Sequence, residues 1–346
     1  TATFLHHRTA PVSSGDKRIN RVIKKRWAKR AQWGIVRNHQ GLLLRRNGIR
    51  NRNNMSSSDR APSVGILANP AAGRDIRRLV AQASVFPISE KRNMIQRLFT
   101  ALGRVGVGTV YMMTDKNGIS DRIRHALDTP PPGGQTWPHV AFFDMPVTES
   151  AADTLHAVEL MVERGVGGII VLGGDGTHRL VASKCGDIPM TALSTGTNNV
   201  FPEMREATIA GIATGLVAMG QVPRDEAVRR NKALRVDVNG VERDLALVDL
   251  CASTALWVGS RALWRAEGLD QLFLAFSEAD AVGLSSIGGL VHPLSRTAEN
   301  GLLLNLAEPD TARQVVTAPL APGLMVDIGI ESVHELKPGE ATPLRV

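Results

Sequence analysis

A short apolar run that ends in a glycine-rich turn places the strongest constraint on this chain. Residues 167–172 read Gly-Gly-Ile-Ile-Val-Leu, and residues 173–177 read Gly-Gly-Asp-Gly-Thr. The apolar run has the length and bulk of a buried strand. The glycines let the backbone come close to a phosphate, and Asp175 is the only ionisable group in the turn. The pattern indicates phosphoryl transfer to or from a nucleotide.

The aspartate of this turn is open to two interpretations. Asp175 can serve as a general base for a hydroxyl nucleophile, or hold Mg²⁺ beside phosphates. It can also be a turn residue that caps the helix expected from Thr177, because Asp and Thr are good caps. The other residues of the turn predicted to bind nucleotide are Gly173, Gly174, Gly176 and Thr177.

Strands and helices are expected to alternate from residue 63 to residue 219. Predicted strands occupy residues 63–68, 106–112, 139–144, 167–172 and 189–193. Predicted helices occupy residues 89–102, 120–127, 148–164, 177–184 and 206–219, the first of them with Ser89 as N-cap and Gly103 as stop. This alternation predicts a doubly wound, mainly parallel sheet, in which ligands bind beyond the carboxyl ends of the strands.

After about residue 223 the pattern changes to predominantly β. Residues 234–238 alternate with period two, Asn239-Gly240 is a hairpin signal, and a strand is expected to resume over 241–251. Further strands are expected at 301–307 and 325–330, with a helical insert at 260–278. We therefore predict an α/β protein with a leader (1–61), a nucleotide-binding kinase domain (62–230) and a β-rich C-terminal domain (231–346).

The charge of the chain is concentrated at its start. Residues 1–54 hold 14 Lys and Arg against one acid, Asp16, and the rest holds 27 bases and 32 acids. The first methionine is Met55. We interpret the leader as upstream sequence added by an over-extended gene prediction or as a disordered tail, with a basic nucleic-acid arm or a transit peptide as the alternatives. Basic composition alone supplies no element that reads a groove, so nucleic-acid binding is not expected.

The remaining composition is that of an ordinary soluble protein. The 346 residues suffice for two domains with separate cores, and no apolar stretch reaches the ~20 residues of a membrane span. Cys185 and Cys251 lie far apart without ligand-like spacing, which predicts neither a disulfide framework nor a zinc site. A cytoplasmic location fits best.

Two further polar loops follow predicted strands. Residues 194–199 read Ser-Thr-Gly-Thr-Asn-Asn and offer donors and acceptors for ribose or phosphate oxygens. Residues 69–74 read Asn-Pro-Ala-Ala-Gly-Arg. A plain polar turn is the alternative for each loop. The predicted nucleotide-binding residues here are Asn69, Gly73, Gly196, Thr197, Asn198 and Asn199, with Arg74 as a possible phosphate ligand.

The two loops at 173–177 and 196–199 together resemble those of the superfamily of NAD kinases and diacylglycerol or sphingosine-type lipid kinases. Asn69-Pro70 with Gly73 is similar to the first phosphate-side loop of that group, and residues 284–293 resemble its Ser-x-Gly-Gly-x-x-x-His-Pro segment. Residues 194–202, with 206–211 after them, look closest to the ATP-NAD-kinase-like proteins associated with acetoin catabolism. The resemblance covers about residues 62–346.

The resemblance implies a nucleotide site between an α/β domain and a β-rich domain. It implies that Asp175 deprotonates a ribose 2′-hydroxyl, that the glycine turn contacts phosphates, and that Asn198 or Asn199 holds the nucleotide. ATP and a divalent metal, usually Mg²⁺, are the implied co-substrate and cofactor. Such transfer needs mainly positioning and charge neutralisation. NAD kinases are generally oligomers, so a homo-oligomer is expected.

The chain also departs from the superfamily patterns. Val200 stands where the lipid-kinase pattern has Asp, which weakens the lipid interpretation. Val248-Asp249 is the nearest match to the Asn-Glu or Asn-Asp pair of NAD kinases, so Asp249 is a possible site residue without its amide partner. Residues 273–280 stand where the Thr-Pro-Thr-Gly-Ser-Thr segment is expected. Both missing elements help to grip NAD, so the acceptor is left open.

Three hypotheses follow. The first is an ATP-dependent kinase that phosphorylates the ribose 2′-hydroxyl of NAD or a related nucleotide, in which His178, in the first turn of the expected helix, is a possible phosphate contact. The second is a lipid or other small-alcohol kinase. The third is a non-catalytic nucleotide-binding regulator of acetoin metabolism. The sequence does not distinguish ATP from polyphosphate as donor.

Overall fold

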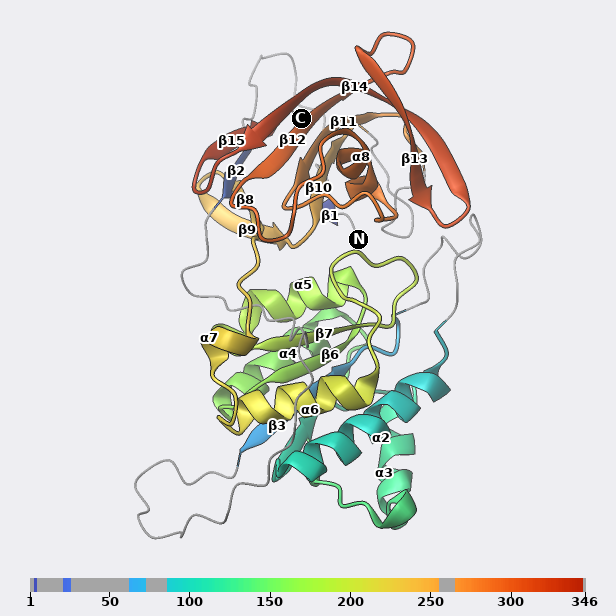
Figure 1. Cartoon of the computed structure of the whole chain (residues 1–346), viewed down its shortest axis with the longest axis vertical. Coiled ribbons are helices and arrows are strands. Elements are labelled where there is room, and N and C mark those ends of the chain that lie inside the picture. The colour runs from blue at the N-terminus through green and yellow to red at the C-terminus, as the bar shows by residue number, and fades with distance from the viewer. Residues whose placement is uncertain (1–2, 5–20, 26–61, 73–85, 255–264, 345–346) are drawn as a thin grey trace.

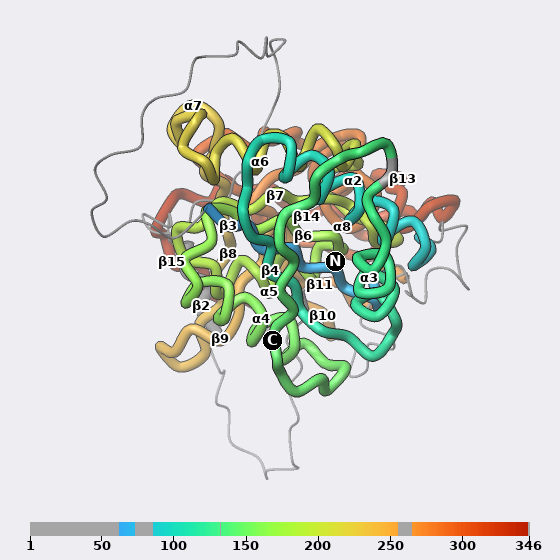
Figure 2. The backbone as a smooth tube through the Cα atoms, turned by 90° about the horizontal axis from the view of Figure 1, so that it is seen from below, coloured from blue at the N-terminus to red at the C-terminus, as the bar shows by residue number. Residues whose placement is uncertain are grey.

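The computed structural model of the chain describes residues 3–4, 21–25, 62–72, 86–254 and 265–344 (Figure 1). Gly73 and Arg74, both expected at the first phosphate-side loop, lie outside these residues, as does most of the expected leader. Figure 1 shows a predominantly β domain at the top and an α/β domain below it. In Figure 2, which is seen from below, the α/β domain lies in front of the other.

The α/β domain is built on a parallel five-stranded sheet of order β5-β4-β3-β6-β7. Its strands are β3 (Ser63–Ala68), β4 (Thr109–Met112), β5 (His139–Phe142), β6 (Ile169–Gly173) and β7 (Met190–Ser194). Its helices are α2 (Ile88–Val105), α3 (Ile119–Leu127), α4 (Ala151–Glu163), α5 (Asp175–Lys184) and α6 (Ala207–Ala218), with a 3-10 turn at Pro132–Gly134 and a short α7 (Arg224–Ala227) at the exit.

Helices cover both faces of this sheet. Apolar residues of α2, α3 and α6 pack on one face, and those of α4 and α5 pack on the other. Strand β6, which lies between β3 and β7, is buried along its whole length, as its continuous apolar run predicts. The predicted doubly wound α/β fold is therefore confirmed.

The C-terminal domain combines two sheets of order β1-β10-β11-β12-β14-β13 and β15-β2-β8-β9. Its helix α8 (Leu284–Val291) packs its apolar residues against the six-stranded sheet. The strands are β1 (Thr3–Phe4), β2 (Arg21–Lys25), β8 (Leu234–Val238), β9 (Val241–Ala246), β10 (Asp249–Ser253), β11 (Leu269–Leu274), β12 (Gly301–Ala307), β13 (Gln314–Ala321), β14 (Leu324–Leu336) and β15 (Ala341–Leu344). The β-rich character predicted for this region is confirmed.

Several element boundaries differ from the sequence prediction. Residues 269–274 of the expected helical insert form strand β11, which pairs with β10 and β12. Residues 260–264 of that insert lie outside the described residues. The strand expected over 241–251 divides at residues 247–248, and its two parts enter different sheets. Residues 269–274 form a strand because β10 and β12 pair with them. The strand expected over 241–251 divides because β9 pairs with β8, whereas β10 pairs with β1 and β11.

Helix α2 also starts and ends elsewhere than predicted. Pro87 precedes it as N-cap, and Ser89 lies in its first turn. The helix continues through Gly103 and ends at Val105, with Gly106 (φ 95°) as its C-cap. A Cβ on Gly103 would lie 2.0 Å from the carbonyl oxygen of Thr136, so this glycine serves close packing and not helix termination.

Two segments of the expected leader are strands. β1 pairs parallel with β10, and β2 lies between β15 and β8. The backbone groups of these segments pair with strands of the C-terminal domain, and the interpretation of residues 1–61 as a disordered or non-native leader stays a prediction. The division of the chain at residues 61 and 230 stays a prediction. In the part of the chain that the structure describes, no helix combines the length and apolarity needed to cross a bilayer.

Candidate functional site

Three of the predicted polar loops start side by side at one edge of the parallel sheet. Strands β3, β6 and β7 are neighbours and run in the same direction. The backbone N–H of Asn69 donates to the carbonyl oxygen of Leu172 (3.0 Å), and the backbone N–H of Thr195 donates to the carbonyl oxygen of Gly173 (3.0 Å). The loops that follow these strands are therefore joined from their first residues, as expected for the carboxyl edge of a doubly wound sheet.

Asn69 and Thr177 connect the first loop to the glycine turn. The Nδ2 of Asn69 donates to the Oγ1 of Thr177 over 2.8 Å, and its Oδ1 accepts from the amide of Ala71 over 2.8 Å. The side chain of Thr177 in turn lies against Gly173, where an added Cβ would be 2.6 Å from the Cβ of Thr177. Gly173 is thus required by packing within the protein.

Asn199 fills the space between the second and third loops. Its Nδ2 donates to the Oγ of Ser194 over 2.7 Å. Its Oδ1 would lie 2.8 Å from a Cβ on Gly174 and 2.5 Å from a Cβ on Gly196. These two glycines therefore allow the amide side chain of Asn199 to pack against both loops, whether or not a ligand is bound.

The structure places Asp175 at the first position of α5 and buries it to 3% exposure. Gly174 is the N-cap of that helix, so Asp175 is not the cap considered from the sequence. Its carboxylate instead accepts hydrogen bonds from the amides of Val200 (3.1 Å) and Phe201 (2.8 Å). Burial acts to raise the pKa of this carboxyl, and the two amides act to lower it. Asp175 thus anchors the loop that carries Asn198 and Asn199.

His178 supports the glycine turn from within the domain. The imidazole is fully buried, its Nδ1 lies 2.8 Å from the carbonyl oxygen of Gly174, and its ring is 6.0 Å from that of Phe201. Burial holds the pKa of His178 below its ordinary value, against the raising effect of the Gly174 carbonyl. Its Nε2 finds no hydrogen-bond partner among the described residues. A phosphate contact by this residue stays a prediction.

Lys91 is a site residue that sequence reasoning missed. It projects from α2 and is fully buried. Its Nζ donates to the carbonyl oxygens of Asn69 (2.9 Å) and Ala72 (2.7 Å), which fixes the path of the first loop. In the sequence Lys91 lies between Glu90 and Arg92 and looks like part of a solvated helix face. Only the position of the helix above the loop shows its role.

Several polar groups around the glycine turn have no partner among the described residues and can therefore contact a ligand. At Gly176 an added Cβ would have no described atom within 4 Å, in contrast to Gly173 and Gly174. The N-terminus of α5 has no side-chain cap in the described structure. The buried hydroxyls of Thr195 and Thr197 likewise have no described partner. An uncapped helix N-terminus with room beside a glycine can receive an anionic group such as a phosphate.

The two remaining predicted residues, Asn198 and Asp249, lie in different places. Asn198 is buried at 8% exposure, and its Nδ2 lies 3.5 Å from the place of a Cβ on Gly283 of the C-terminal domain. It therefore stands where the two domains meet. Asp249 is the first residue of β10, opposite Leu274 of β11, and belongs to the six-stranded sheet and not to the three loops.

Comparison with known proteins gives matches to both domains. Residues 64–222 match the family model of the ATP-NAD kinase N-terminal domain, and residues 232–346 match that of the acetoin catabolism protein X C-terminal domain. A protein of Cupriavidus necator named acetoin catabolism protein X is 42% identical over 294 residues, which cover 84% of this chain and 82% of that protein.

Proposed function

This chain belongs to the acetoin catabolism protein X family and has an ATP-NAD kinase N-terminal domain at residues 64–222, and we propose that it is an ATP-dependent phosphotransferase. The proposed acceptor is the ribose 2′-hydroxyl of NAD or a related nucleotide. The observation that carries the proposal is the open, uncapped N-terminus of α5 at Gly176, in the loop cluster after β3, β6 and β7. The name of the C. necator relative supports a role in acetoin catabolism.

In this proposal the three loops after β3, β6 and β7 each contribute to binding the nucleotide. Phosphate oxygens lie at the backbone of Gly173, Gly174 and Gly176, where the N-terminus of α5 favours negative charge. Asn69 orients Thr177 by their hydrogen bond, and Lys91 holds the backbone of Asn69. The third loop contributes to the nucleotide site through Gly196, Thr197, Asn198 and Asn199.

Asp175 is the proposed base. Its carboxylate takes the proton of the acceptor hydroxyl as that oxygen forms a bond to the γ-phosphorus of ATP and the bond to ADP breaks. The amides of Val200 and Phe201 fix the direction of the carboxylate. The same amides reduce the basicity of the group, so Asp175 positions the hydroxyl in addition to accepting its proton.

The residues present fit a metal ion that is carried by the nucleotide. No cluster of three or more His, Cys, Asp or Glu suited to a metal ion occurs in residues 62–72, 86–254 or 265–344. Mg²⁺ is usually bound through one or two carboxylates and substrate phosphates, and Asp175 is the carboxylate of this loop cluster. When bound, the ion would neutralise charge on the phosphates.

The proposal is tested by measuring NADP formation from ATP and NAD with the full chain. The wild type should form NADP, and Asp175→Asn should lower kcat by at least ~100-fold, the range of a lost acid–base group. Thermal unfolding and circular dichroism establish that both proteins are folded. A folded wild type that forms no NADP overturns the NAD assignment, and a panel of other nucleotides and lipid alcohols then decides whether another acceptor is used.

A second candidate function is nucleotide binding without turnover. The engagement of Asp175 by two backbone amides favours it, because a carboxylate already used as an anchor is less available to a substrate proton. This alternative expects that ATP raises the unfolding temperature in a concentration-dependent way. It also expects no phosphorylated product with any member of the acceptor panel.

A further inference from the structure

An arginine of the C-terminal domain contacts the loop that Asp175 anchors. Arg296 lies between α8 and β12, and its side chain is 16% exposed. Its Nη1 donates to the carbonyl oxygen of Phe201 over 2.7 Å, and its Nη2 donates to that of Val200 over 2.5 Å. The guanidinium thus holds two consecutive carbonyls of the α/β domain from the side of the C-terminal domain.

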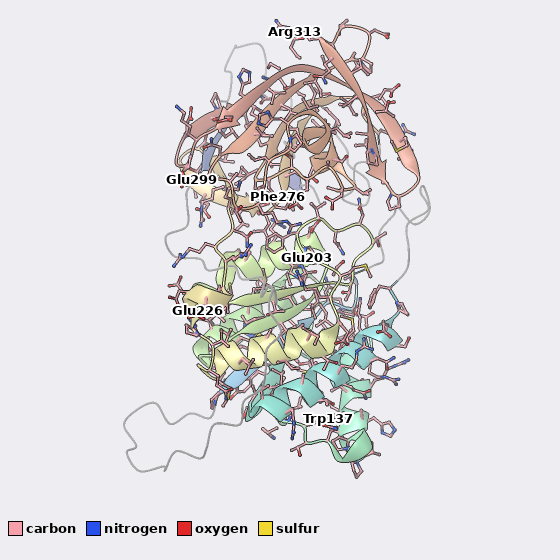
Figure 3. The ribbon with its side chains drawn as sticks, in the orientation of Figure 1. Trp137, Glu203, Glu226, Phe276, Glu299 and Arg313 are labelled. Carbon is pink, nitrogen blue, oxygen red and sulfur yellow. The ribbon has the colours of Figure 1, made fainter. Side chains whose placement is uncertain are left out.

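Two residues of the C-terminal domain, Glu278 and Phe276, hold the guanidinium of Arg296 in place. Glu278 accepts from its Nε over 3.0 and 3.1 Å and from its Nη2 over 2.9 Å. The guanidinium also lies 4.4 Å from the centre of the Phe276 ring. Figure 3 places Phe276 at the underside of the C-terminal domain and Glu203 at the facing side of the α/β domain. An ion pair and a stacking contact together leave the planar group little freedom.

The segment that carries Arg296 is anchored at both ends by one lysine. Lys232 lies in the connection between α7 and β8 and is 7% exposed. Its Nζ donates to the carbonyl oxygens of Ser295 (3.2 Å) and Asn300 (2.7 Å). The connection between the two domains therefore sets the position of the segment that holds Arg296.

The peptide group between Val200 and Phe201 is held at both of its polar ends. Its N–H donates to Asp175, and its C=O accepts from Arg296. The dipole of this peptide group therefore points its positive end to a carboxylate and its negative end to a guanidinium, an arrangement in which each charge strengthens the opposite hydrogen bond. Asp175 and the C-terminal domain are thus coupled through a single peptide group.

We propose that Arg296 is a positioning residue through which the C-terminal domain sets the place of Asp175 and of the loop at 197–201. The effect that we infer on phosphoryl transfer rests on the proposed function. The coupling of Asp175 to the C-terminal domain through the Val200–Phe201 peptide does not. Docking of the domains orders the Val200–Phe201 peptide, and the ordered peptide fixes the carboxylate that faces the acceptor. Loss of Arg296 therefore affects the transfer step more than it affects nucleotide binding.

The test compares Arg296→Met and Arg296→Lys with a matched control, Arg313→Met. Arg313 pairs with Glu331 on the surface of the C-terminal domain, far from Phe276 in Figure 3. Hydrogen exchange is measured in the full chain at the backbone amides of residues 198–203, apart from Pro202, which has no amide hydrogen. Exchange should rise at least tenfold in Arg296→Met, rise less in Arg296→Lys, which keeps a donor, and stay unchanged in Arg313→Met.

Kinetics then separate positioning from a purely structural role. In Arg296→Met we expect kcat to fall at least tenfold, KM for ATP to change less than threefold, and Arg296→Lys to recover part of kcat. Glu278→Gln, which keeps the contacts to Val200 and Phe201 but loosens the guanidinium, should give an intermediate kcat and serves if Arg296→Met fails to fold.

The outcomes distinguish the inference from the proposed function. Unchanged exchange at residues 198–203 in a folded Arg296→Met overturns the coupling, whatever the activity. Raised exchange with unchanged kcat overturns the positioning role. If the wild type transfers no phosphoryl group, the proposed function fails, and the exchange measurement alone decides on the coupling.

Discussion

Asp175 and Arg296 hold the same peptide group, the one that joins Val200 to Phe201, from its two polar ends. One side chain comes from the first turn of α5 and the other from the segment before β12 of the other domain. The aspartate that the glycine turn presents is therefore placed by both domains. This relationship connects the predicted base to the docking of the C-terminal domain.

Gly176 offers a test that separates ligand binding from folding. An alanine there would meet no described atom within 4 Å of its Cβ, so Gly176→Ala should leave the free energy of unfolding unchanged or raise it by up to ~1 kcal/mol through better helix propensity. If a phosphate lies at the N-terminus of α5, the added methyl group lowers ATP affinity, and we expect at least a tenfold increase in Kd. Urea denaturation and ATP titration measure the two effects.

Gly173→Ala is the matched control for this prediction. The new Cβ would stand 2.6 Å from that of Thr177, and the crowding should destabilise the protein by ~1–3 kcal/mol. The site interpretation of Gly176 is contradicted by a Gly176→Ala protein that binds ATP as tightly as the wild type. Equal destabilisation by the two substitutions would contradict the packing difference between them.

Lys91 should contribute strongly to stability although it lies on a charged stretch of sequence. Lys91→Met removes the Lys91 donor from the Ala72 carbonyl and one of the two donors from the Asn69 carbonyl, and each lost hydrogen bond from a charged group costs ~1.5–3 kcal/mol. We expect a loss of ~2–5 kcal/mol in the free energy of unfolding, measured by urea denaturation. Arg104→Met, an exposed position in the last turn of the same helix, should change it by less than ~0.5 kcal/mol. Equal losses of stability in Lys91→Met and Arg104→Met would contradict the stabilising role assigned to Lys91.

His178 should make the protein less stable in mild acid. Burial holds its folded-state pKa below the ordinary value of 6.5, so below pH 6.5 the unfolded chain binds a proton that the folded chain does not. Stability is therefore lost as the pH falls, by no more than ~1.4 kcal/mol per pH unit for one group. Denaturation at a series of pH values from 7.5 to 5 measures the slope.

The contribution of His178 is isolated by comparison with His178→Phe, which has no imidazole to protonate. The stability advantage of the wild type over this variant should shrink as the pH falls. An advantage that stays constant between pH 7.5 and 5 would show that the imidazole does not cause the acid sensitivity.

Lys232 should likewise make the protein more stable as the pH rises, but in the basic range. Burial lowers its pKa from 10.5 to about 8, so between these values the unfolded chain holds a proton that the folded chain has lost. Stability attributable to this group therefore rises from pH 8 to pH 10.5, by up to ~3 kcal/mol at ~1.4 kcal/mol per unit. The measurement is the difference in unfolding free energy between wild type and Lys232→Met across this range.

Comparison with Lys232→Met cancels the ionisation of the other basic-range groups, which both proteins share. A difference that falls as the pH rises would contradict the sign of the lowered pKa. Exchange at residues 198–203 should also rise in Lys232→Met, because the segment that carries Arg296 loses its anchor.

The sequence predicted the fold class and the kinase-type loop cluster because both depend on local patterns. A continuous apolar run before Gly173–Thr177 identifies a buried parallel strand, and the carboxyl ends of such strands share one edge of a sheet. The family assignment rested on the same short segments and is confirmed by the comparisons. The nucleotide-binding roles of the individual residues stay predictions.

The sequence did not predict the groups that hold these loops in place. Lys91 and Arg296 occur in stretches that look solvated, and strand β11 falls where a helix was expected. Their roles depend on contacts with carbonyl groups or strands that are distant in sequence, and a local sequence pattern does not predict such contacts.

By itself the sequence determined that a glycine turn with one carboxylate ends a buried strand, because glycine and apolar periodicity act on neighbouring residues. Only the tertiary structure decided that Asp175 points to Val200 and Phe201 and that Arg296 holds their carbonyls. Hydrogen bonds of this kind require two domains to be docked, and docking is a property of surfaces assembled from the whole chain.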